Sequence, residues 1–131
     1  MQYPYRKGTP MIDLTDTVTR YLAIWNEEDA DKRAAAIGEL FTPDAPYIDP
    51  LAAVAGHDGV AAVITGAREQ FKGLSFELLG TVDTHHNIAR FQWGLVTEAG
   101  AEPIAIGFDV AVTGEDGTIS GVYGFLDKLP A

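Results

Sequence analysis

The hydrophobic pattern of this chain changes its period once, at Lys72-Gly73. Before this point apolar residues recur every three or four positions, which is the spacing of an amphipathic helix. After it apolar and polar residues alternate, which is the spacing of a strand with one buried face. A helical first half followed by a strand-rich second half predicts an α+β fold, with a curved sheet and its helices on one face.

Three helices are predicted in the first half. The first spans residues 13–26, the second about 31–41, and the third follows Gly56, with Asp58 as its expected N-cap. One short strand, residues 47–49, lies between the second and third helices. It ends at Pro50, which has no N–H to donate to a neighbouring strand.

Four longer strands are predicted in the second half, joined as an antiparallel meander. The polar residues 83–87 are interpreted as the first hairpin connection, so His85 and His86 are expected in a turn. The small residues 51–56, before the third helix, are expected to be irregular. The four predicted strands span residues 74–80, 88–96, 104–112 and 119–126.

The length and the residue types limit the chemistry that is open to this chain. With 131 residues, one domain over residues 12–131 is expected, preceded by a flexible leader over residues 1–11. The absence of cysteine excludes disulfides, zinc-thiolate sites and thiol nucleophiles. No metal site and no cofactor are predicted. Without a long apolar run or the apolar centre of a signal peptide, a cytoplasmic location is expected.

The charge of the chain bears on its partners. Nine Lys and Arg stand against nineteen Asp and Glu, for a formal net charge of −10, and the basic residues do not cluster. Nucleic acids and anionic membranes both bind through a positive face that neutralises phosphates. Neither is therefore an expected partner.

Asp49 is the first candidate functional residue. It ends the short strand and stands directly before Pro50, so it has two interpretations. Asp before Pro is a common turn former, which gives Asp49 a purely local role. A carboxylate fixed at a strand end also points in a definite direction, which suits a positioned acid or base.

The predicted strand 104–112 has two unlike faces. One face carries the large residues Ile106, Phe108, Val110 and Val112, and the other carries Gly107, Asp109 and Ala111. In one interpretation the large face packs on the helices and Asp109 lies in water. In the other, the small face borders a cavity under the helices. Strand faces in water usually carry Thr, Lys or Glu, so the second interpretation is favoured.

The cavity interpretation has two consequences. Burial among apolar neighbours would raise the pKa of Asp109. The large face of the same strand would need cover on a soluble protein, so a homodimer through the outer, convex face of the sheet is predicted.

Tyr21 lies on the buried side of the first predicted helix, and it completes a candidate set with Asp49 and Asp109. Two acids in unlike environments supply a base and a neutral hydrogen-bond donor to one pocket, and a phenol supplies a second donor. Apolar residues from the helices and strands are expected to line this pocket and contact a small apolar ligand. The predicted lining residues are Trp25, Ile64, Phe71, Trp93 and Phe125.

Several motifs in order resemble one known family. Arg20-Tyr21 with Asn26, the segment Leu40-Phe41-Thr42-Pro43-Asp44-Ala45 leading to Asp49-Pro50, and Gly56-His57-Asp58-Gly59-Val60 are similar to the SnoaL-like and ketosteroid-isomerase-like branch of the nuclear-transport-factor-two-like superfamily. The resemblance covers residues 12–128. It implies a cone-shaped fold, in which a strongly bent antiparallel sheet wraps around three helices and encloses a deep apolar pocket.

The resemblance also implies roles for the candidate residues. In ketosteroid isomerases the matching tyrosine and strand Asp are hydrogen-bond donors to an oxyanion, and the Asp of the Asp-Pro step moves the proton. This implies a cofactor-free isomerase or cyclase in which Asp49 is the base and Tyr21 and Asp109 are donors. Two positions depart from related patterns. Ala67 stands where the isomerases carry another aromatic hydroxyl, and Gly107 stands where related epoxide hydrolases carry Arg.

Two further hypotheses stay open at this stage, because the fold by itself does not decide function. The domain is either a non-catalytic module that binds a small apolar ligand, or a dimerisation scaffold in which Asp49 only forms a turn.

Overall fold

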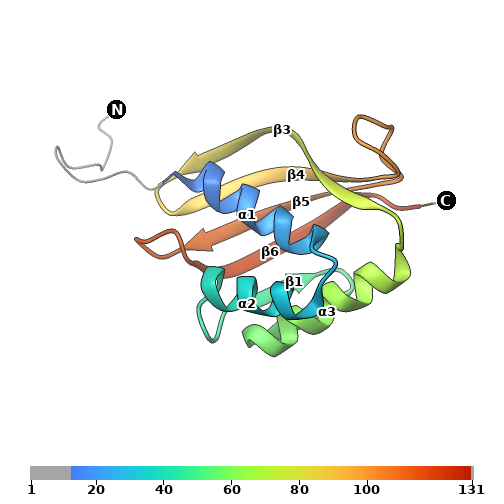
Figure 1. Ribbon diagram of the computed structural model, residues 1–131. Coiled ribbons are helices and arrows are strands. Elements are labelled where there is room, and N and C mark those ends of the chain that lie inside the picture. The colour runs from blue at the N-terminus through green and yellow to red at the C-terminus, as the bar shows by residue number, and fades with distance from the viewer. Residues whose placement is uncertain (1–12, 131) are drawn as a thin grey trace.

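The computed structural model describes residues 13–130, which form three helices and one six-stranded sheet (Figure 1). The predicted leader, residues 1–11, lies outside the described residues. The helices are α1 (Leu14–Asn26), α2 (Ala30–Leu40) and α3 (Gly56–Gln70). The strands are β1 (Pro46–Asp49), β2 (Ala52–Ala55), β3 (Ser75–His85), β4 (Ile88–Val96), β5 (Ala105–Thr113) and β6 (Ile119–Lys128).

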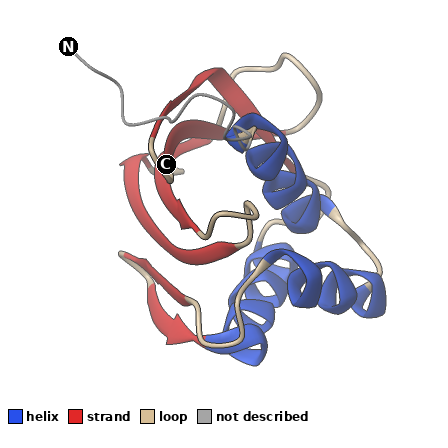
Figure 2. Cartoon of the chain, turned by 90° about the vertical axis from the view of Figure 1, so that its left-hand side faces the viewer, coloured by secondary structure: helices blue, strands red, loops and turns tan. Residues whose placement is uncertain are grey.

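The α+β architecture predicted from the sequence is confirmed. The strands lie in the order β2-β1-β6-β5-β4-β3, and neighbouring strands are antiparallel except for the parallel pair β1 and β6. Figure 2 shows the sheet curling so that its concave side faces the helices. Helix α1 packs on β3 and β4, whereas α3 packs on α2, β1 and β2. Among the described residues, no helix is long and apolar enough to cross a membrane.

The helix starts follow local capping chemistry in two cases of three. The side chains of Asp13 and Asp29 accept hydrogen bonds from backbone N–H groups in the first turns of α1 and α2. The prediction of Asp58 as the N-cap of the third helix was wrong, since α3 begins at Gly56 and its N-cap, Ala55, makes no side-chain capping hydrogen bond. Asp58 lies inside the first turn, where its charge interacts favourably with the helix dipole.

Strand β2 was not predicted, because residues 51–56 were expected to be irregular. It pairs antiparallel with β1, and Asp49 lies opposite Ala52. The Asp49 carboxylate closes the turn between the two strands, since its Oδ1 accepts 2.8 Å hydrogen bonds from the N–H groups of Leu51 and Ala52. Small alanine-rich segments show no clear alternation, so the pattern of hydrophobic residues gave no signal for this edge strand.

Strand β3 extends beyond its predicted end at Gly80. Its register with β4 shifts between Leu79 and Asp83, and Gly80 has φ +70°. Such a bulge lets a strand continue past residues that fall out of alternation. The predicted turn over residues 83–87 is consequently too long: His85 belongs to β3, and His86, with φ +50°, stands in the turn.

The small-residue face of β5 faces the helices. Ala105, Asp109 and Ala111 are buried, whereas Phe108 and Val110 on the opposite face are only half-buried. The interpretation that placed Asp109 in water is therefore wrong. Gly107 shows why this face must be small, since a Cβ there would overlap the indole ring of Trp93 and lie 2.7 Å from the Phe125 carbonyl oxygen.

Candidate functional site

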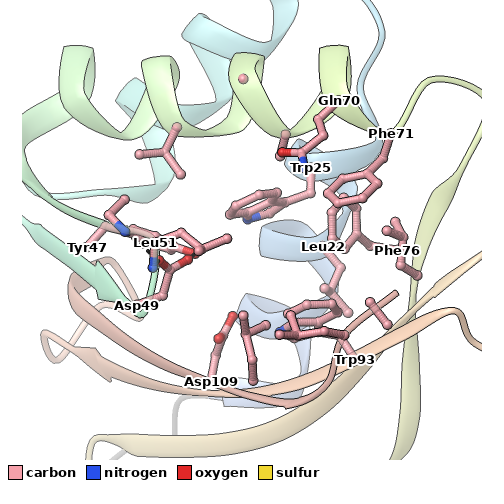
Figure 3. A pocket seen from close by; sticks show the side chains of 18 of the residues that line it. Leu22, Trp25, Tyr47, Asp49, Leu51, Gln70, Phe71, Phe76, Trp93 and Asp109 are labelled. Carbon is pink, nitrogen blue, oxygen red and sulfur yellow. Dashed lines mark hydrogen bonds between the residues drawn. The ribbon is translucent and has the colours of Figure 1, made fainter. Parts of the chain in front are cut away.

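A cavity of about 330 Å³ lies between the concave side of the sheet and helices α1 and α3. Most of its wall is apolar, and four side chains with hydroxyl or carboxylate groups interrupt that wall (Figure 3). A largely apolar cavity with a few converging polar groups is the usual form of a small-molecule site. The four polar side chains are Tyr21 from α1, Tyr47 and Asp49 from β1, and Asp109 from β5.

Asp109 and Tyr21 form one half of the polar group. The Tyr21 hydroxyl donates a 3.1 Å hydrogen bond to Asp109 Oδ2, and both side chains are buried. Tyr21 reaches the sheet because it lies on the inner side of α1, where its ring packs edge-on against Phe91 of β4 at 5.7 Å between centroids. Phe91 of β4 pairs with Asp109 of β5. The ring contact with Phe91 therefore also holds Tyr21 beside the Asp109 carboxylate.

Asp49 and Tyr47 form the other half. Because strand residues two apart point to the same face, the side chains of Tyr47 and Asp49 both enter the cavity. The Tyr47 hydroxyl donates a 2.6 Å hydrogen bond to Asp49 Oδ2, while the turn N–H groups hold Oδ1. Asp49 is half-buried, and its carboxylate is fixed by three donors.

Gly124 of β6 lies between the two carboxylates. It pairs with Asp109, and a Cβ at this position would lie 2.5 Å from Asp109 Oδ1 and 3.4 Å from the Asp49 Cβ. The carboxylates thus extend from β1 and β5 across a strand with no side chain at that level. The absence of a side chain at Gly124 therefore lets the two acids approach each other over the β6 backbone.

Burial controls the protonation of Asp109, Tyr21 and Tyr47. Desolvation raises the pKa of Asp109 to about 7, and the negative charge of Asp49 acts in the same direction, whereas hydrogen bonds from Trp93 and Tyr21 lower it. Burial, followed by the charge of Asp109, also raises the pKa of Tyr21 and Tyr47 well above the ordinary phenol value. Both phenols therefore stay protonated donors at neutral pH.

The predicted lining residues are only partly brought to the cavity. Trp25, Phe71 and Trp93 line it, but Ile64 and Phe125 do not. Ile64 is fully buried in the core, one residue further round α3 than the lining residue Val63. Phe125 is 54% exposed on the outer face of the sheet, where its ring stacks on Phe108 at 4.9 Å.

The described residues hold no group of three His, Asp or Glu side chains that is suited to binding a metal ion. The polar groups at the cavity are phenol, indole and carboxyl groups and the carboxamide of Gln70, and they come from five separate elements.

A family model for the SnoaL-like domain matches residues 18–122 of the chain. The chain belongs to the SnoaL-like family. Among solved structures, a candidate isomerase of the SnoaL-like family from Agrobacterium tumefaciens is 40% identical, with a TM-score of 0.79 over 86% of this chain and 95% of the other. No protein of curated function matches the sequence.

Two more distant structures share the fold of this SnoaL-like domain. A candidate ketosteroid isomerase from Kribbella flavida is 16% identical, with a TM-score of 0.64 over 90% of this chain and 80% of the other. A candidate polyketide cyclase from Sinorhizobium meliloti is 18% identical, with a TM-score of 0.65 over 83% and 93% of the two chains. At these identities the two structures show a shared fold.

The sequence did not single out two residues of the SnoaL-like site. Tyr47 carried a signal, since it stands two residues before Asp49 in a strand and therefore shares its face. Gly124 carried none, because its position between the two acids depends on the parallel pairing of β1 with β6, which joins segments far apart in the sequence.

Proposed function

We propose that this SnoaL-like domain is a cofactor-free enzyme that transfers a proton next to a carbonyl of a small apolar ring compound, as an isomerase or a cyclase. The observation that carries the proposal is the opposition of two acids across one apolar cavity. Asp49 is half-buried and fixed by donors, whereas Asp109 is buried and hydrogen-bonded to a phenol. Unlike environments of this kind separate the roles of base and neutral donor.

In the proposed reaction, Asp49 removes a proton from the carbon beside the carbonyl. The electron pair of that C–H bond moves onto the carbonyl oxygen and forms an enolate. Tyr21 and protonated Asp109 donate hydrogen bonds to this oxygen, where the negative charge develops. In an isomerase Asp49 returns the proton to a different carbon. In a cyclase the enolate carbon attacks a second carbonyl of the same molecule, the π electron pair of that carbonyl moves to its oxygen, and this oxygen takes the proton from Asp49. No cofactor is required for either outcome.

The hydrogen bonds at Asp49 fit a positioned base. Tyr47 and the two turn N–H groups fix the carboxylate toward the cavity, so little reorganisation is needed during proton transfer.

The direct test is exchange of hydrogen for deuterium beside the carbonyl of an activated ring ketone such as 2-tetralone, followed by NMR. Asp49→Asn is expected to remove nearly all enzymatic exchange, and Asp109→Ala to lower the rate roughly 10²–10³-fold. Asp127→Asn, an exposed acid on β6 outside the cavity wall, is the matched control and should leave the rate unchanged. Exchange that persists at the wild-type rate in both cavity variants contradicts the proposal.

A second function, binding of a small apolar ligand without turnover, is favoured by one observation. Both oxygens of Asp49 already accept hydrogen bonds, which is the state of a carboxylate with a structural role. Calorimetry separates the two functions: a binding module keeps its affinity in Asp49→Asn and releases its ligand chemically unchanged.

We also propose that the domain acts as a homodimer in the cytoplasm, joined through the outer face of the sheet. The support is an apolar group on that face, in which the Phe108 and Phe125 rings stack and Tyr123 and Phe125 are exposed. Apolar surface of this kind is usually covered by a partner. Cell fractionation tests the location, and the assembly is tested by the oligomeric state.

A further inference from the structure

Trp25 carries an unpaired polar group at the cavity. Its side chain is 7% exposed and lines the cavity, and no protein atom accepts a hydrogen bond from its indole Nε1. In the described part of the chain it is the one buried side-chain nitrogen or oxygen that lacks a partner. Buried polar groups in folded proteins nearly always have a partner, so this indole points to something that occupies the cavity.

The indole ring cannot easily turn away to find another acceptor. It packs edge-on against Phe76 at 5.1 Å between centroids and lies 5.9 Å from the Tyr47 ring and 6.2 Å from the Tyr21 ring. The carbonyl of Trp25 accepts a 2.8 Å hydrogen bond from Arg68 Nη1, which ties this end of α1 to α3. A ring enclosed on several sides keeps one rotamer, so its N–H has a fixed direction.

That direction is into the cavity. Figure 3 shows the Trp25 ring extending from α1 into the space bordered by α3 on one side and by Asp49 and Asp109 on the other. Trp25 lies four residues after Tyr21, so both side chains emerge from the same face of α1. The protein acceptor that the Trp25 indole N–H acts on is the Tyr21 hydroxyl, and this hydrogen-bond interaction lowers the pKa of Tyr21 against the larger effects of burial and of Asp109. The contact does not reach hydrogen-bond geometry, so the N–H remains available to a ligand oxygen beside Tyr21.

We propose that Trp25 is a ligand-binding residue whose indole N–H donates to an oxygen of the bound molecule, so that the cavity selects oxygenated ring compounds over hydrocarbons of the same shape. This extends the proposed function because it uses the same cavity, but it requires only binding and no proton transfer. A ligand without an oxygen leaves the indole N–H buried and unpaired, which lowers its affinity.

The test uses two flat ring compounds that differ by one oxygen, 2-naphthol and naphthalene. The chain has two tryptophans, Trp25 and Trp93, so two indole N–H signals are expected in a proton–nitrogen NMR spectrum. In the wild-type protein, 2-naphthol is expected to move the Trp25 indole proton to lower field, as a new hydrogen bond does. Naphthalene should produce only the small shift of a nearby ring. Equal shifts with both compounds overturn the proposal, as does binding of neither compound.

A variant gives the second readout. Trp25→Phe keeps an aromatic ring and removes the donor, so it should weaken 2-naphthol roughly tenfold and leave naphthalene nearly unchanged. Phe76→Leu, which alters the packing of Trp25 without removing a donor, should change both affinities by the same factor. An equal effect of Trp25→Phe on the affinities for both compounds overturns the proposal. If this variant does not fold, the wild-type NMR spectra alone test the proposal.

Failure of this inference is distinguishable from failure of the proposed enzyme. The same titrations in Asp49→Asn, which lacks the base, should keep the preference for 2-naphthol. A preference retained there without any exchange in the wild-type protein supports the Trp25 site and argues against the enzyme. Exchange in the wild-type protein, without a preference for 2-naphthol that depends on Trp25, supports the enzyme and argues against the Trp25 site.

Discussion

Burial of Asp109 links the stability of the domain to pH. The pKa of this carboxyl rises from 3.8 to about 7 on folding, so between these values the folded state holds a proton that the unfolded state has released. Stability is therefore lost as pH rises from about 4 to about 7. At 1.36 kcal/mol per pKa unit, the loss is about 4 kcal/mol.

We expect chemical denaturation at pH 5 and pH 8 to show this loss in the wild-type protein. In Asp109→Asn, which cannot titrate, the difference between the two pH values should shrink by a few kcal/mol. The exposed control Asp127→Asn should keep the wild-type difference. An unchanged pH dependence in Asp109→Asn would show that another group is responsible. The exchange rate is expected to fall above about pH 7, because ionised Asp109 no longer donates to the enolate.

A second prediction for a single residue concerns the substitution of Gly124 by alanine. Gly124→Ala adds a Cβ 2.5 Å from Asp109 Oδ1, so the carboxyl or the strand must move. Overpacking of a buried site destabilises proteins by about 1–3 kcal/mol, and a comparable loss is expected here. The variant should also lower the exchange rate on 2-tetralone, because it displaces a proposed donor. Thermal unfolding and the exchange assay measure the two effects, and wild-type values in both would contradict the assigned position of Gly124.

At the scale of elements, the same type of substitution in helix α2 is expected to have the opposite effect on stability. Gly38 is exposed in the last turn of α2, and a Cβ there meets nothing within 4 Å. Alanine is favoured over glycine inside a helix by about 1 kcal/mol, so Gly38→Ala should stabilise the domain by roughly that amount. Its exchange rate should equal that of the wild-type protein, because α2 does not contribute to the cavity wall. A drop in unfolding temperature would contradict this prediction.

The bounds of a strand were predicted well where apolar and polar residues alternate regularly, and poorly where they do not. The bounds of β4 over residues 88–96 match the prediction, because apolar and polar residues alternate from Ala89 to Trp93 at its centre. Strand β2 consists of alanines and one valine, and β3 continues through a bulge at Gly80. In both cases the strand is held by pairing with a neighbour, which a local pattern does not record.

At the scale of the whole molecule, the proposed dimer makes a prediction about the outer face of the sheet. Phe125→Asp places a charge in the exposed apolar group on β6 and breaks the stack with Phe108. A charge buried at an interface without a partner is costly, so the variant should be monomeric at micromolar concentrations at which the wild-type protein is dimeric. Light scattering measures both masses, and Leu129→Asp, another exposed apolar site, is the control. A wild-type monomer would contradict the proposal.

The sequence by itself determined the α+β class and the buried side of Tyr21, and it favoured the inward direction of Asp109. Each of these depends on side-chain periodicity, which is a local property. Only the tertiary structure decided that Asp49 and Asp109 face each other across Gly124, that Tyr47 holds Asp49, and that Trp25 has an unpaired N–H. These depend on the parallel pairing of β1 with β6 and on the curvature of the sheet. Both join residues far apart in the sequence, so no local pattern specifies them.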